Sequence, residues 1–153
     1  MARRYDFEAS ARSRASAEAI WPLVGEATRW KEWSWMTRTD LLRQGDPPPD
    51  GVGALRRFAF GPGGSKEEVV VWDPPHHLGY VVVRGLPVRN YRADVHLDTD
   101  TGTGTGTLVT WRCSLEPLIP GTGGALRVAL RAMVGGFARR LCRYADGPAP
   151  GEA

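Results

Sequence analysis

The amino-acid sequence predicts an α+β fold in which a curved antiparallel sheet of seven strands wraps around one long C-terminal helix, with two short helices after the first strand. Three observations predict this fold. Segments in which apolar and polar residues alternate recur along the chain, as expected for strands with one buried face. Short breaks rich in Gly and Pro separate these segments, and short connections join antiparallel neighbours. A single long amphipathic stretch follows the last of them.

The length and composition agree with one globular domain. The chain has 153 residues, of which 42% are apolar and 24% are charged, and these fractions are ordinary for a folded domain. Its 19 glycines and 12 prolines favour many short elements joined by turns. We expect residues 1–146 to form this domain and the Pro/Gly/Ala-rich residues 147–153 to form a flexible tail. The Ala/Gly/Arg-rich composition suggests a bacterial source.

The first elements follow from alternation and helix capping. Residues 5–13 alternate between apolar and polar side chains and predict the first strand. Ser16 can accept hydrogen bonds from the free amides of a first helical turn, so a short helix is expected directly after it. A second short helix is expected over Ala27–Trp33. The six further strands are expected over residues 36–43, 53–60, 66–73, 78–84, 90–99 and 107–116.

Residues 122–145 predict the long helix, because apolar residues recur there at spacings of three and four. The predicted buried stripe consists of Leu126, Leu130, Met133, Val134, Phe137 and Leu141. Gly135 and Gly136 each cost the helix about 1 kcal/mol relative to alanine, which indicates close approach of another element or space beside a ligand. One helix cannot fill the concave face of a seven-stranded sheet, so we expect a ligand cavity between the two layers.

Charge and hydropathy argue against several classes of partner. The net charge is +3, from 20 basic and 17 acidic residues, and the arginines are scattered, so no nucleic-acid partner is expected. The N-terminus lacks the apolar stretch of a signal peptide, and no segment approaches the ~18 apolar residues of a membrane span. Cys113 and Cys142 lack the spacing of a metal or redox site. We expect both to be buried, reduced thiols in a cytoplasmic protein.

No cofactor is expected. The chain has 3 histidines and no HExxH motif, so no metal site is predicted. No GxGxxG motif joins a strand to a helix, which argues against a nucleotide cofactor. The GxSxG motif of nucleophilic hydrolases is absent. The sequence leaves open whether the protein is a monomer or a homodimer.

The predicted strands and helix supply candidates for the wall of the cavity. The apolar candidates are Phe58, Val95, Val109, Trp111, Met133 and Phe137. Tyr80 and Tyr91 lie on strands in apolar surroundings, where a phenol can donate a hydrogen bond to a ligand carbonyl or act as an acid. His76 can act as a general base if it faces the cavity, although a histidine in a surface turn is the simpler interpretation.

Alternation sends one of Arg56 and Arg57 to the concave face, where it would need a carboxylate or a ligand oxygen as a partner. Phe58 and Phe60 favour Arg56, whereas Leu55 and Ala59 favour Arg57. The sequence leaves this choice open and slightly favours Arg57. Glu67 and Glu68 raise the same question, and solvation at the start of a strand is the simpler interpretation for both. The candidates for catalysis are Arg57, Tyr80, Tyr91 and His76.

Several motifs carry a resemblance to a known family. They are the segment Ser16–Val24 (SAEAIWPLV), the W-x-x-W pattern of Trp30–Trp33, Gly51-Val52-Gly53, Asp73-Pro74-Pro75 and Gly106–Trp111. In this order and spacing they resemble the SRPBCC superfamily, the helix-grip fold of START-related lipid-binding domains and polyketide cyclase/dehydrase-like proteins. The resemblance covers residues 5–145. It implies a pocket for hydrophobic or aromatic molecules, with Trp33 and Trp35 at the pocket mouth.

Three functions are open on this basis. The first is binding of a small hydrophobic or aromatic, polyketide-like molecule between the sheet and the helix. The second is a polyketide cyclase, aromatase or dehydratase that polarises carbonyls with arginine and tyrosine and positions a bound chain for reaction. The third is a protein-interaction module of the same fold. The lack of a recognisable acid–base pair in the sequence favours binding.

Overall fold

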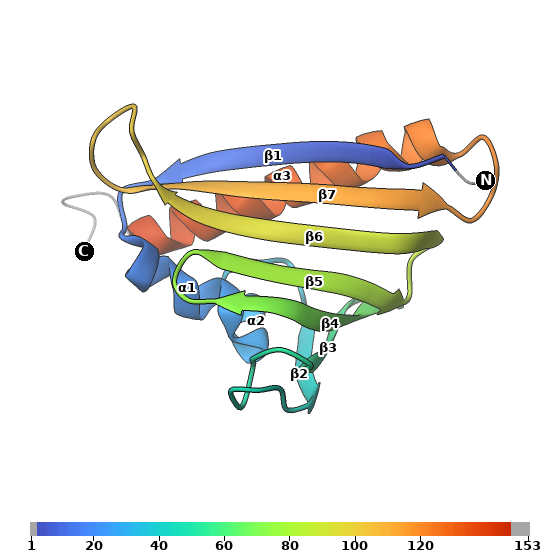
Figure 1. The fold of residues 1–153 in the computed structure, drawn as a ribbon, viewed down its shortest axis with the longest axis horizontal. Helices are drawn as coiled ribbons and strands as arrows, with labels where there is room; N and C mark the ends of the chain where they lie inside the picture. Colours follow the sequence, from blue (N-terminus) through green and yellow to red (C-terminus); the bar gives the residue numbers. More distant parts are fainter. Residues whose placement is uncertain (1–2, 148–153) are drawn as a thin grey trace.

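The structure is a computed structural model that describes residues 3–147. Seven strands form one antiparallel sheet in the order β1-β7-β6-β5-β4-β3-β2 (Figure 1). The strands are β1 (Tyr5–Ser13), β2 (Arg38–Arg43), β3 (Leu55–Phe60), β4 (Gly63–Asp73), β5 (His77–Arg84), β6 (Val88–Thr99) and β7 (Thr107–Pro117). The helices are α1 (Ala17–Gly25), the 3-10 helix η1 (Ala27–Arg29), α2 (Trp30–Trp33) and α3 (Gly123–Asp146). The predicted fold is confirmed.

The short helices begin where the sequence predicts them. The Ser16 hydroxyl accepts a hydrogen bond from the Ala19 amide at 3.2 Å and so caps α1. α1 buries Ile20 and Val24 against the core. The second predicted helix consists of two pieces, η1 and α2, and it positions Trp30 and Trp33 as buried side chains.

The long β6–β7 pair forms the regular centre of the sheet. Val95 lies opposite Trp111, and Leu97 lies opposite Val109. All four side chains are buried, as the alternation in both strands predicts. β1 then pairs with the outer side of β7 and becomes one edge of the sheet (Figure 1).

α3 lies across the concave face of the sheet, alongside β1 and β7 (Figure 1). Leu130, Val134, Phe137 and Leu141 are buried as predicted, whereas Leu126 and Met133 are partly exposed. The helix approaches β1 so closely at Gly123 that a Cβ atom there would collide with the Tyr5 ring. Because α3 packs along β1 and β7, its backbone lies away from β3 to β5, and a cavity can form between them.

Several further sequence predictions concern the described residues. Cys113 and Cys142 are both free and buried. No helix within residues 3–147 is long and apolar enough to cross a membrane. Gly147, the first residue of the predicted tail, has a φ of 71° and ends α3. The rest of the predicted tail lies outside the described residues.

Candidate ligand-binding site

A cavity of about 180 Å³ lies between the concave face of the sheet and α3. β3, β4, β5 and Tyr91 of β6 form one wall and α3 forms another, while the start of β4 at Gly63–Gly64 and the turn at Gly85–Leu86 border one end. Most of the wall is apolar. Its aromatic members are Trp30, Phe58, Phe60, Tyr80, Tyr91 and Phe137.

One ion pair is built into this wall. Arg56 on β3 and Glu67 on β4 occupy directly opposite positions, and Arg56 Nη2 donates a hydrogen bond to Glu67 Oε1 at 2.8 Å. The Arg56 side chain is fully buried, and that of Glu67 is 9% exposed. Glu67 lines the cavity. Burial raises the pKa of Glu67, and the charge and hydrogen bond of Arg56 oppose this rise.

Aromatic rings surround the Arg56 guanidinium. Its central carbon lies 5.5, 5.1 and 4.9 Å from the ring centres of Trp30, Phe58 and Tyr80, respectively. Such contacts stabilise a desolvated cation through the negative faces of the rings. Arg56 Nε and Nη1 have no hydrogen-bond partner among the described residues. The ion pair and the rings therefore compensate the buried charge only in part.

The inward arginine is Arg56, so the slight preference for Arg57 was wrong. Arg57 lies on the convex face with its side chain 33% exposed, and its Nη2 is 2.8 Å from Asp40 Oδ2. Asp40 is the residue directly opposite Arg57 on β2. The convex face thus supplies a partner for Arg57, while Phe58 and Arg56 share the buried face. Glu67 faces inward for the same reason, since its position opposes Arg56.

Tyr80 and Tyr91 both line the cavity, and each hydroxyl makes a hydrogen bond to a side chain that does not line it. The Tyr80 hydroxyl accepts a hydrogen bond from Trp111 Nε1 at 3.0 Å. The Tyr91 hydroxyl lies 3.5 Å from the sulfur of Cys113 and donates to it. Burial raises the pKa of both tyrosines well above the usual value, so both phenols keep their protons at neutral pH.

The tryptophans occupy different places from those that the resemblance implies. Trp30 lines the cavity. Trp33 is buried away from the cavity, and its Nε1 donates to the Leu23 carbonyl at 2.8 Å. Trp35 does not line the cavity but stacks on Phe137, with ring centres 4.5 Å apart. A Cβ atom at Gly136 would lie 3.0 Å from the Trp35 ring, so this glycine allows the ring to approach α3.

The remaining sequence candidates separate into three groups. Met133 and Phe137 line the cavity from α3, and Phe58 lines it from β3. Val95, Val109 and Trp111 are buried in the packed core, away from the cavity wall. His76 is exposed in the turn between β4 and β5, at the opposite end of this hairpin from the cavity.

The sequence interpretation did not include Glu67, Gly63–Gly64 or Gly85–Leu86 in the wall. Glu67 carried a signal, because a buried arginine on β3 requires a carboxylate opposite it on β4. Recognising that signal required the choice between Arg56 and Arg57, which strand alternation left open. Gly63–Gly64 and Gly85–Leu86 carried no such signal, because the glycine-rich sequence predicts ordinary turns at both places, whereas Gly63 and Gly64 begin β4.

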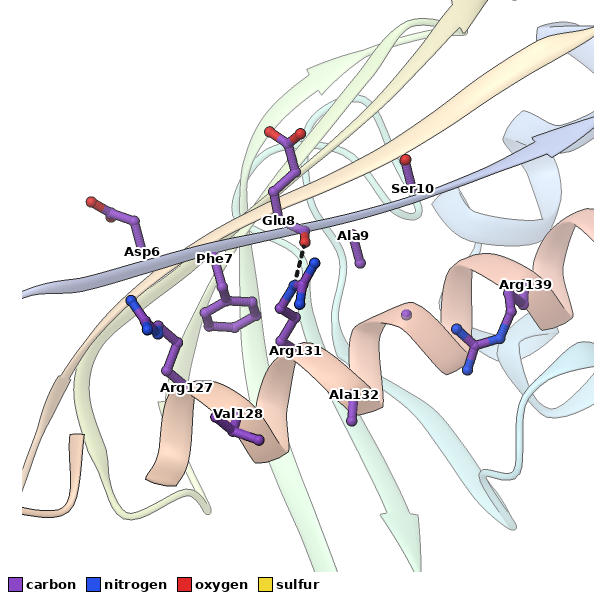
Figure 2. A pocket seen from close by; sticks show the side chains of 11 residues that line it. Asp6, Phe7, Glu8, Ala9, Ser10, Arg127, Val128, Arg131, Ala132 and Arg139 are labelled. Atoms are coloured by element: carbon purple, nitrogen blue, oxygen red, sulfur yellow. Dashed lines mark hydrogen bonds between the residues drawn. The ribbon is translucent and has the colours of Figure 1, made fainter. Parts of the chain in front are cut away.

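A larger hollow of about 860 Å³ lies outside the core, between the edge strand β1 and α3 (Figure 2). Arg127, Arg131 and Arg139 extend from α3 along it, and Arg131 Nε donates to the Glu8 carbonyl at 3.1 Å. These arginines are exposed. Water competes with a ligand in such an open, charged groove, so the smaller apolar cavity is the better candidate for a small hydrophobic ligand.

The sheet, the long helix and the apolar cavity between them define a helix-grip domain of the ligand-binding type. The chain belongs to the polyketide cyclase / dehydrase and lipid transport family, whose model matches residues 4–145. This places it in the START-related SRPBCC superfamily, as the sequence motifs predicted. A comparison with curated proteins gave no match.

Solved structures share the fold at low sequence identity. A START superfamily protein from Mycobacterium smegmatis has a TM-score of 0.74 at 14% identity, covering 89% of this chain and 93% of that one. A norcoclaurine synthase point mutant from Thalictrum flavum, in complex with a transition-state analogue, has a TM-score of 0.73 at 17% identity, covering 95% and 96%. The same synthase in complex with dopamine and hydroxybenzaldehyde has a TM-score of 0.70 at 15% identity, covering 97% and 90%.

Proposed function

We propose that this protein binds a small hydrophobic or aromatic molecule, about one ring in size, in the cavity between β3–β5 and α3. The observation that carries the proposal is the aromatic wall around about 180 Å³ of space. Apolar cavities of about 150 Å³ take up benzene, whereas pockets for drug-sized ligands span about 300 to 1,000 Å³. The volume therefore favours a single ring with a short substituent over an extended poly-carbonyl chain.

One of the fold neighbours is solved with aromatic ligands, which supports the aromatic character of the proposed ligand. The norcoclaurine synthase of Thalictrum flavum has been solved with dopamine and hydroxybenzaldehyde, two molecules with one aromatic ring each. The family description of lipid transport and polyketide chemistry also agrees with an apolar ligand. The aromatic residues that α2, the sheet and α3 contribute to the wall offer stacking and edge contacts to such a ring.

Thermal unfolding with a panel of ring compounds tests this proposal. Phenol, p-cresol and toluene should raise the melting temperature in a concentration-dependent way, because they bind the folded state and not the unfolded chain. They should also change tryptophan fluorescence, since Trp30 lies in the wall. A tetracyclic compound such as pyrene should have no effect. Absence of a shift with every one-ring compound would overturn the proposal.

A cyclase or dehydratase is the second candidate function, and the position of Glu67 favours it. The Glu67 carboxyl and the Tyr80 phenol line the same wall, and burial raises the pKa of both. A carboxyl with a raised pKa can remove a proton beside a ligand carbonyl, and a phenol can donate to that carbonyl. The protein should then accelerate hydrogen–deuterium exchange at the methyl group of acetophenone, followed by NMR. Exchange at the background rate, despite bound acetophenone, would rule against this function.

A further inference from the structure

Glu67 gives the cavity a directional polar feature. Among the described residues that line the cavity, it alone carries a formal charge. Its Oε1 accepts the hydrogen bond from Arg56, and Oε2 has no protein donor among the described residues. The only fully buried side-chain atoms without a partner among the described residues are Arg56 Nε and Nη1. Glu67 Oε2 therefore retains some exposed surface. The residual exposure of this side chain is therefore available to a ligand in the cavity.

Arg56, in contrast to Glu67, does not reach the surface of the cavity. Its side chain is fully buried, and Trp30, Phe58 and Tyr80 cover it. These three rings line the cavity, whereas Arg56 does not. An arginine keeps its proton in a protein, so a fully buried one requires a counter-charge. Arg56 thus favours the ionised form of Glu67 and orients its carboxylate, without offering its own donors to a ligand.

We infer that the ligand presents a hydrogen-bond donor, a hydroxyl or a protonated amine, to Glu67 Oε2, and that Arg56 acts as the positioning residue for this carboxylate. This inference rests on the proposed function and narrows it to one-ring molecules with a donor group. A ring without a donor leaves the carboxylate oxygen desolvated and unpaired, which is the condition under which binding sites discriminate most strongly. A ligand carboxylate would meet Glu67 before it could meet Arg56, and like charges repel.

Matched one-ring compounds test the inference on the wild-type protein. Phenol should bind at least as tightly as toluene, although toluene is the more hydrophobic molecule, and benzoate should bind more weakly than phenol. Dissociation constants come from isothermal titration. Toluene binding more tightly than phenol would overturn the inference while leaving the proposed function intact. Benzoate binding most tightly would also overturn it, because Arg56 would then be the contact. If none of the three bound, the proposed function would fail and this inference with it.

Variants of Glu67 and of the adjacent Glu68 test whether Glu67 causes the preference for phenol over toluene. Glu67→Gln replaces the carboxylate by a neutral amide, so the affinity ratio of phenol to toluene should fall about tenfold, the difference between a charge-assisted and a neutral hydrogen bond. Glu68→Gln is the control, since Glu68 is 39% exposed and pairs with Arg43; its ratio should equal that of the wild type. An unchanged ratio in Glu67→Gln would overturn the inference. If Glu67→Gln does not fold, the wild-type comparison of the three compounds still decides.

Discussion

At the scale of single residues, the Arg56–Glu67 pair gives the sharpest stability prediction. Arg56→Met leaves Glu67 as a buried charge without a partner, and breaking such a pair costs about 3 to 5 kcal/mol of folding free energy. The double variant Arg56→Met with Glu67→Leu should recover most of this loss, because two apolar side chains replace both charges. Urea denaturation of the three proteins measures the differences.

Arg57→Met is the matched control for this experiment, because Arg57 is the next residue on β3 and its side chain is 33% exposed. Loss of its ion pair with Asp40 should cost at most about 1 kcal/mol. Equal losses for Arg56→Met and Arg57→Met would contradict the assignment of Arg56 to the buried face.

The same pair predicts a pH dependence. Burial raises the pKa of Glu67 above its ordinary value of 4.5, and Arg56 opposes the rise. Without Arg56 the pKa should rise further, so the folded state then binds this proton more tightly than the unfolded chain. Stability is then retained below about pH 4.5 and lost as pH rises through the folded-state pKa. Arg56→Met should therefore lose less stability, relative to the wild type, at pH 4 than at pH 8; an equal loss at both values would contradict this.

The two cysteines predict low thiol reactivity. Burial raises the pKa of Cys113 and of Cys142 to about 12. At pH 8 only about one thiol in 10⁴ is then ionised, and the thiolate is the reactive form. Ellman's reagent should label the folded protein slowly, and both thiols should react at once in guanidinium chloride. Rapid labelling of the folded protein at pH 8 would contradict the buried placement.

At the scale of elements, periodicity predicted β1, β6, β7 and α3 well because each has one clearly buried face. β3 is different, because it is 6 residues long and carries apolar side chains on both faces. Its inward face depends on which neighbours β2 and β4 supply: Asp40 opposes Arg57, and Glu67 opposes Arg56. This cross-strand register decides the orientation, and the sequence of β3 alone does not contain it.

Phe137 tests the packing of α3 on the sheet. Its ring contacts Trp30, Trp35 and Trp111, and its side chain is almost fully buried. Phe137→Ala should cost about 3 kcal/mol, the lower end of the range for buried phenylalanines, because one side of the ring already borders the cavity. The control Val128→Ala, on a side chain 68% exposed, should change stability by less than about 0.5 kcal/mol. A loss below 1 kcal/mol for Phe137→Ala would contradict the packing described.

At the scale of the whole molecule, the cavity forms because a single long helix covers a sheet of seven strands. α3 packs along β1 and β7, so only its side chains Met133 and Phe137, together with Trp30, reach over β3 to β5. The sequence predicted that one helix would leave such space, because seven strands exceed its reach. The volume and position of the space depend on which side chains fill it, and this depends on rotamers and on Trp33 and Trp35 packing elsewhere.

Filling the cavity should therefore separate ligand binding from stability. Val82 lines the cavity from β5, and the larger ring of Val82→Phe would occupy part of the roughly 180 Å³. The melting temperature of the free protein should stay the same or rise, since filling a void adds contacts. The shift produced by phenol or toluene should be lost, because the ring of Phe takes the place of the ligand's ring.

Val83→Phe is the control for this variant, because Val83 is the next residue on the same strand and is 59% exposed. It should keep the full ligand-induced shift. A full shift in Val82→Phe as well would mean that the ligand occupies another surface, for example the arginine-lined groove between β1 and α3. A large fall in the melting temperature of Val82→Phe alone would mean that the space is too rigid to accept a ring, which contradicts its assignment as a site for one-ring molecules.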